Sequence, residues 1–180
     1  MTSREILEAR AHRLARRVDS EASAKTTAQM LGFTVGRERY AVGSRFVFAA
    51  VQLVDLVRLP GATAPVLGVT RWRGDILTVL DVRRAVGGLP SALDDLGRVI
   101  VIGESAPEFG ILADTIDGLA SFDPHDVHPV SANRQLGIPG LVAGVTSGGV
   151  HLLDAKILIA HQSASVAPPL VASSSSSASQ

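Results

Sequence analysis

Residues 123–128, with the sequence Asp-Pro-His-Asp-Val-His, hold two histidines and two aspartates within six positions. Imidazole and carboxylate groups are ligands that zinc accepts. Two features argue against a metal here, because a proline-flanked loop is a poor scaffold for fixed ligands and no fourth ligand follows at a recognised spacing. We therefore expect no metal and no cofactor. An enzyme that uses this histidine–aspartate loop as its site is the alternative.

Asp81 and Asp154 are the other candidates for chemistry, because they end two similar apolar runs. Two carboxylates that share a proton can act as an acid and base pair. Each Asp, however, precedes a helical stretch, where a carboxylate accepts backbone N–H bonds as an N-cap. The sequence also has no glycine-rich phosphate loop and no Gly-x-Ser-x-Gly elbow. We predict structural caps at Asp81 and Asp154 and no catalytic residue.

The only tryptophan of the chain stands in the sequence Arg71-Trp72-Arg73-Gly74-Asp75. An exposed indole between two arginines is not favoured by folding alone. Tryptophan and arginine are, however, the residues most enriched at the centres of protein interfaces. We predict that these five residues form an exposed turn that contacts a protein partner. The alternative is that Trp72 folds back onto its own barrel and that the arginines are solvated.

This turn lies in a pattern that the chain contains twice. Gly68-Val69-Thr70 precedes Val79-Leu80-Asp81, and Gly144-Val145-Thr146 precedes Leu152-Leu153-Asp154. The step from glycine to aspartate is 13 positions in the first copy and 10 in the second. We interpret the pattern as an internal duplication of a β-hairpin, with the extra residues of the first copy placed in its turn.

The composition favours a β-rich globular protein without an affinity for nucleic acid. Hydrophobic residues make up 46% of the 180 positions and aromatic residues only 4%, so the core must consist mainly of Val, Ile, Leu and Ala. The formal net charge of zero argues against binding to a phosphate backbone. There is no cysteine, no secretion signal and no apolar run of membrane-spanning length. We expect a cytoplasmic protein without direct membrane insertion.

The termini differ from the central part of the chain. A capping-box pattern at Thr2 and an apolar stripe of Leu7, Leu14 and Val18 predict an amphipathic helix from about Ser3 to Val18. Its Arg-rich face is either solvated or bound to a partner or membrane. Residues 155–161 predict a short closing helix. We expect an N-terminal helix and linker in residues 1–29, one domain in residues 30–162, and a disordered tail in residues 163–180.

The central part resembles the CheW family, the coupling proteins of bacterial chemotaxis, whose domain also occurs in the histidine kinase CheA. The resemblance covers roughly Leu31 to Ala160 and rests on the order and spacing of several short motifs. These are Phe33-Thr34-Val35-Gly36, Val51-Gln52-Leu53-Val54, Arg58-Leu59-Pro60, Gly68-Val69, Arg73-Gly74-Asp75-Ile76, Asp81-Val82-Arg83, Asp114, Gly144-Val145 and Leu152-Leu153-Asp154. It implies a mainly β fold of two small intertwined five-stranded barrels that share a core.

The resemblance also implies a non-catalytic adaptor that couples methyl-accepting chemotaxis receptors to a CheA-type histidine kinase. Its receptor-contact arginine corresponds to Arg73, and a kinase contact is implied near Leu53 and Val54. The chain departs from the family pattern at Leu53, where an acidic residue is usual, at Thr78, which replaces a proline, and in the bulky residues 46–48. These departures leave two alternatives open, a divergent scaffold of a non-flagellar pathway and a small-barrel module that binds a ligand or nucleic acid.

Overall fold

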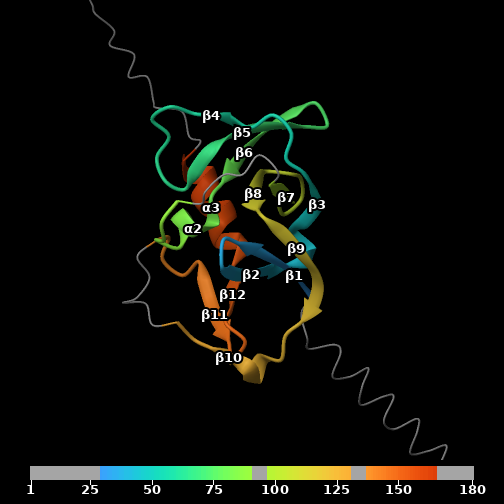
Figure 1. The fold of residues 1–180 in the computed structure, drawn as a ribbon, viewed down its shortest axis with the longest axis vertical. Helices are drawn as coiled ribbons and strands as arrows, with labels where there is room; N and C mark the ends of the chain where they lie inside the picture. Colours follow the sequence, from blue (N-terminus) through green and yellow to red (C-terminus); the bar gives the residue numbers. More distant parts are fainter. Residues whose placement is uncertain (1–28, 91–96, 131–136, 166–180) are drawn as a thin grey trace, which may run out of the picture.

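A computed structural model describes residues 29–90, 97–130 and 137–165. Within these residues the chain forms two six-stranded sheets (Figure 1). The first sheet has the order β10-β11-β12-β2-β1-β9, from β1 (Gln29–Val35), β2 (Glu38–Gly43), β9 (Thr115–Ser121), β10 (Val127–His128), β11 (Val142–Thr146) and β12 (Val150–Leu153). The second sheet has the order β3-β7-β8-β6-β5-β4, from β3 (Val47–Gln52), β4 (Val57–Arg58), β5 (Val66–Trp72), β6 (Asp75–Leu80), β7 (Arg98–Ile102) and β8 (Phe109–Ala113).

The chain path intertwines the two sheets. Strands β1 and β2 begin the first sheet, β3 to β8 build the second, and β9 to β12 complete the first. The two strand orders correspond when the second is read in reverse, as β4-β5-β6-β8-β7-β3. Each sheet then contains one parallel pair at the equivalent place, β12 with β2 and β6 with β8. The duplication that the sequence predicts therefore extends beyond the hairpins to both sheets.

Our expectation of five strands in each unit is one strand too low. The strands β4 and β10 lie at equivalent edges of the two sheets and contain two residues each. Strands of this length have too few residues to show the alternation of apolar and polar side chains by which strands are recognised. The mainly β architecture itself agrees with the prediction.

The two duplicated hairpins differ in the length of their strands. Strands β5 and β6 are each two residues longer than their counterparts β11 and β12, whereas the turn at residues 73–74 is one residue shorter than that at residues 147–149. Both hairpins have a bulge at the glycine of the repeated motif, Gly68 or Gly144. The extra residues of the first copy therefore lengthen a ladder and do not enlarge a turn, which corrects our placement of them.

Each hairpin ends at an aspartate that begins a helix. Asp81 is the N-cap of α2 (Val82–Ala85), and its Oδ1 accepts a bond from the Arg83 amide at 3.0 Å. The Oδ1 of Asp154 accepts one from the Lys156 amide at 2.9 Å at the start of α3 (Ala155–Ser165). Short 3-10 helices, η1 (Ser44–Phe46) and η2 (Pro124–Asp126), complete the described elements.

The closing helix is longer than the sequence predicts. It continues four residues beyond residue 161, so residues 163–165 are helical and do not belong to a tail. The predicted N-terminal helix in residues 3–18 and the rest of the predicted tail lie outside the described residues.

One hydrophobic cluster joins both sheets. Figure 1 shows α3 between β6 of the second sheet and β12 of the first. Buried side chains from the two sheets and from α2 and α3 meet here, including Phe33 and Tyr40 from the first sheet, Ile100 and Phe109 from the second, and Leu158. Each sheet also has a smaller cluster of its own on its other side, and we call the one around Val79, Val99, Val101 and Leu112 the second-sheet cluster.

A polar contact links the two sheets beside the shared cluster. Arg83 of α2 lies with its Nε 3.3 Å from Oε2 of Glu38 in β2, and the Tyr40 hydroxyl donates to the same oxygen at 2.6 Å. Burial raises the pKa of Tyr40 well above its ordinary value, and Glu38 raises it further, so the phenol stays protonated as a donor. The two halves are thus joined by an ion pair as well as by apolar packing.

Candidate protein-binding site

The hairpin of β5 and β6 ends in a tight two-residue turn. Trp72 and Asp75 are the last paired residues, and between them Arg73 has φ 50° and Gly74 has φ 97°. Positive φ at both central residues is the requirement of a type I′ turn. Of the five residues that we expected in an exposed turn, only Arg73 and Gly74 form it, because Arg71 and Trp72 belong to β5 and Asp75 to β6.

Trp72 is half-buried, which corrects our expectation of an exposed indole. Its side chain packs against the second-sheet cluster, which agrees with the alternative that Trp72 folds back onto its own barrel. The Arg73 guanidinium lies over the indole, 4.7 Å from the ring centroid, which is the geometry of a cation–π contact. Arg71, Arg73, Gly74 and Asp75 are exposed. The hairpin tip therefore presents a cation held on an aromatic surface.

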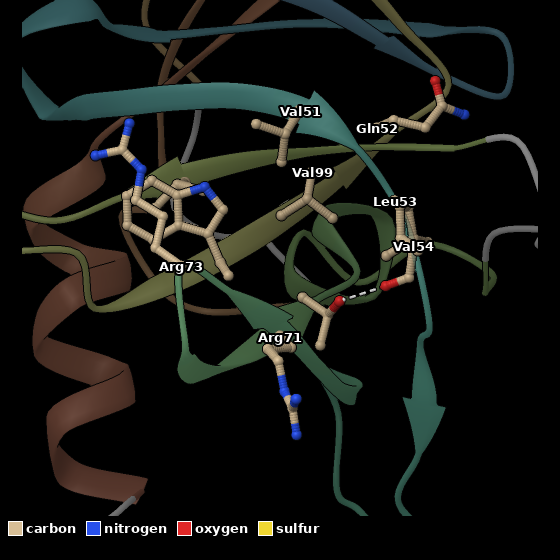
Figure 2. Close-up of a pocket in the computed structure, with 10 residues that line it drawn as sticks. Val51, Gln52, Leu53, Val54, Arg71, Arg73 and Val99 are labelled. Atoms are coloured by element: carbon tan, nitrogen blue, oxygen red, sulfur yellow. Dashed lines mark hydrogen bonds between the residues drawn. The ribbon is translucent and has the colours of Figure 1, made fainter.

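A cavity of about 180 Å³ opens beside this hairpin tip. Figure 2 shows Val51 and Val99 at its floor, with Arg73 on one side and Leu53 and Val54 on the other. Gln52, Thr70, Arg71, Trp72 and Val101 complete the lining. The cavity thus has apolar walls with guanidinium and amide groups at its rim, a composition that suits an apolar side chain flanked by polar groups.

The structure brings the predicted receptor and kinase contacts together. Leu53 and Val54 line the same cavity as Arg71, Trp72 and Arg73, and the Thr70 hydroxyl donates to the Val54 carbonyl oxygen at 2.9 Å. Gly74 and Asp75, the other two predicted contact residues, are not among the lining residues. Two contacts that we inferred separately from the sequence therefore adjoin.

Leu53 and Val54, where the resemblance implies a kinase contact, differ in their exposure. Val54 is 61% exposed, whereas Leu53 is half-buried against the second-sheet cluster. Exposed apolar side chains continue from Val54 at Val57 and Leu59. The exposed strip thus consists of Val54, Val57 and Leu59, and it runs from the cavity along the edge of the second sheet.

Sequence reasoning missed the part of the cavity lining that β7 supplies. Val99 and Val101 lie on β7 and reach the cavity only because β7 pairs with β3, about 50 residues earlier in the chain. Their alternation along β7 predicts a shared inward face, but nothing local indicates which segment they meet. Such a contact between distant segments is set by sheet topology.

The aspartate and histidine segment forms local contacts instead of a ligand cluster. Asp123 accepts a bond from the His125 amide at 2.8 Å as the N-cap of η2, and His128 Nε2 lies 3.2 Å from the Ser147 hydroxyl. Among the described residues, no three His, Asp or Glu side chains gather closely enough to hold a metal ion. No helix in the described ranges is both long and apolar enough to cross a membrane.

The comparisons with known proteins agree with this architecture. A family model of the CheW-like domain matches residues 29–163. The chain is 27% identical over 128 residues to protein FrzA of Myxococcus xanthus, covering 71% of this chain and 80% of FrzA. Its fold is similar to the crystal structure of the scaffolding protein TtCheW from Thermoanaerobacter tengcongensis, with a TM-score of 0.59 and 17% identity over 72% of this chain and 85% of that one. The duplicated sheets and the family match together establish that the chain belongs to the CheW-like domain family.

Proposed function

We propose that this chain is a non-catalytic adaptor that couples methyl-accepting chemotaxis receptors to a CheA-type histidine kinase. Membership of the CheW-like family supports a role as a scaffold in chemosensory signalling. The observation that carries the proposal is the cavity of the second sheet, which is lined by the stacked Arg73 and by Val54, the first residue of the exposed apolar strip, without any catalytic constellation among its lining residues. The adaptor acts in the cytoplasm and is recruited to receptor arrays at the membrane.

We assign the two sides of the cavity to two partners. The Trp72 and Arg73 side takes the receptor tip, because an immobilised guanidinium can bind carboxylate or carbonyl groups at the end of a receptor helix pair. The exposed strip of Val54, Val57 and Leu59 takes the kinase, because contiguous exposed apolar side chains mark a protein contact. Partners thus meet neighbouring surfaces of one sheet.

Val54→Asp tests the kinase side. Because Val54 is 61% exposed, the substitution should leave the fold intact while it places a charge in the apolar contact. We expect about tenfold weaker binding to the regulatory domain of the kinase, measured by calorimetry, which corresponds to roughly 1.4 kcal/mol. Leu119→Asp is the matched control, since Leu119 is 63% exposed on β9 of the first sheet and does not line the cavity. Equal losses for both variants, or loss of the β-sheet circular dichroism signal, would contradict the assignment.

The single tryptophan makes occupancy of the cavity directly measurable. Trp72 is the only tryptophan and lines the cavity, so its fluorescence reports on this site alone. A receptor cytoplasmic fragment without tryptophan should shift the emission to shorter wavelength and reduce quenching by acrylamide, because the partner excludes water from the indole. A fragment that binds by calorimetry but leaves Trp72 quenching unchanged would place the receptor contact elsewhere.

A further inference from the structure

A second hollow lies on the first sheet, away from the proposed receptor and kinase surfaces. It has a volume of about 500 Å³ and lies where β1 begins and where β12 passes into α3. Its apolar walls include Met30, Phe46 and Leu153, and its polar lining includes Arg45 and Asp154. It shares Met30 and Ala143 with an adjoining apolar hollow of about 420 Å³, so the two form one extended groove.

The equivalent residues of the second sheet are more deeply buried. Asp81 and Asp154 occupy corresponding places at the ends of β6 and β12, but Asp81 is completely buried and Asp154 is only half-buried. Ala143 lines the groove and is exposed, whereas its counterpart Leu67 on β5 is half-buried. Equivalent residues of the duplicated architecture are therefore more exposed at this corner of the first sheet than in the second.

The chain itself supplies a segment suited to this groove. Gln29, where the described part begins, lines the groove, so the preceding residues leave from its edge. Residues 3–18 have an apolar stripe at helical spacing that contains Leu7, Leu14 and Val18. The ten residues between them and Gln29 can span about 33 Å when extended, at roughly 3.3 Å per residue. A segment tethered this closely has a high effective concentration at the groove.

Charge favours the same occupant. Residues 3–18 contain five arginines and two glutamates, and the formal net charge of the whole chain is zero, so the rest carries an opposite excess of three. Asp154 provides a carboxylate within the groove for one of these arginines, and Arg45 can meet a glutamate. Exposed ion pairs add little affinity, so the apolar stripe must supply most of it and the charges set the orientation.

We infer that residues 3–18 dock as an amphipathic helix in the groove of Met30, Phe46, Ala143 and Leu153 of the same molecule. The stripe faces the apolar walls and the arginine-rich side faces solvent and Asp154. This contact would bury Ala143 and Asp154 further, as their counterparts Leu67 and Asp81 are more deeply buried in the second sheet. It is independent of the proposed partners, because it uses the opposite sheet.

The absence of native cysteine provides a clean test with the full chain. In an Ala143→Cys variant, the rate of thiol alkylation reports on access to the groove. We expect at least fivefold faster alkylation when Leu14→Asp is added, because a charge in the stripe releases the segment. Ala9→Asp is the matched control, since it adds the same charge to the opposite face of the predicted helix and should preserve protection.

A second reporter and a concentration series complete the test. Ala50→Cys lies on the exposed side of β3 in the second sheet, so its alkylation should not respond to Leu14→Asp. Equal alkylation of Ala143→Cys with and without Leu14→Asp would overturn the inference. So would protection that increases with protein concentration, because the segment of another copy would then fill the groove. Protection that does not depend on concentration and is lost only with Leu14→Asp supports docking within one molecule.

Discussion

Arg73→Glu is expected to weaken binding to a receptor cytoplasmic fragment by at least thirtyfold while binding to the kinase regulatory domain changes little. The substitution removes the cation that lies 4.7 Å from the Trp72 ring centroid and replaces it with a carboxylate at the rim of the cavity. Loss of a central anchor commonly costs about 2 kcal/mol, which corresponds to roughly thirtyfold in the dissociation constant. Titration calorimetry against both partners measures the two effects.

The control for this variant must reverse the same charge elsewhere. Arg37→Glu does so in the exposed turn between β1 and β2 of the first sheet, and it should leave receptor binding within twofold of the parent. Arg73 already adopts a positive φ although it is not glycine, so a glutamate at this position is under the same backbone strain as the arginine that it replaces. The melting temperature should therefore remain close to that of the parent. Unchanged receptor affinity for Arg73→Glu would remove Arg73 from the site.

The proximity of the two contacts gives this experiment a further outcome. Leu53 and Val54 line the same cavity as Arg73, so a partner that covers the whole cavity would depend on both sides. Equal loss of both partners in Arg73→Glu, with an unchanged melting temperature, would mean that one surface serves receptor and kinase in turn. Equal loss with a lowered melting temperature would instead indicate a misfolded hairpin.

The sequence predicts the repeated architecture well because the repeat is local. Each copy contains a glycine, two apolar strands and an N-capping aspartate within 14 residues, and these short-range signals place the hairpins and both helix starts correctly. The short edge strands β4 and β10 cannot be predicted in this way, because two residues are too few to show an alternation of apolar and polar side chains. The count of strands depends on pairing partners distant in the chain.

The hairpin tip shows why the site is harder to predict than the fold. Three extra residues lengthen the step from the glycine to the aspartate of the motif by the same amount in either of two cases. They can enlarge the turn, or they can lengthen the strands on both sides of it. The alternation of β5 distinguishes these cases, because Thr70 is buried and Trp72 is half-buried, whereas Arg71 between them is exposed. Extending this period through residue 72 would have placed the indole against the sheet. The contribution of Val99 and Val101 to the cavity could not be predicted in this way, because it depends on the long-range pairing of β7 with β3.

Gly68→Ala is expected to destabilise the protein strongly and to disturb the cavity as well. A Cβ atom at this position would lie 2.3 Å from the Val57 carbonyl oxygen and 3.0 Å from the Arg58 Cα, so the backbone of β4 must move away from β5. Overpacking of this kind typically costs about 1–3 kcal/mol. Because β4 follows Val54 by only three residues, its displacement should also weaken kinase binding.

Gly144→Ala in the second copy of the motif is the internal control. There the nearest atom to an added Cβ is Val127 Cγ1 at 2.4 Å, and the first backbone atom, the His128 carbonyl oxygen, is 3.1 Å away. A half-buried valine side chain can change rotamer more easily than a paired strand can shift, so the loss of stability should be smaller and kinase binding should be kept. Thermal unfolding followed by circular dichroism, together with calorimetry against the kinase domain, compares the two variants. A melting temperature for Gly68→Ala equal to that of the parent would show that β4 does not approach β5 as described. An equal loss of kinase binding in both variants would show that displacement of β4 is not the cause of the loss.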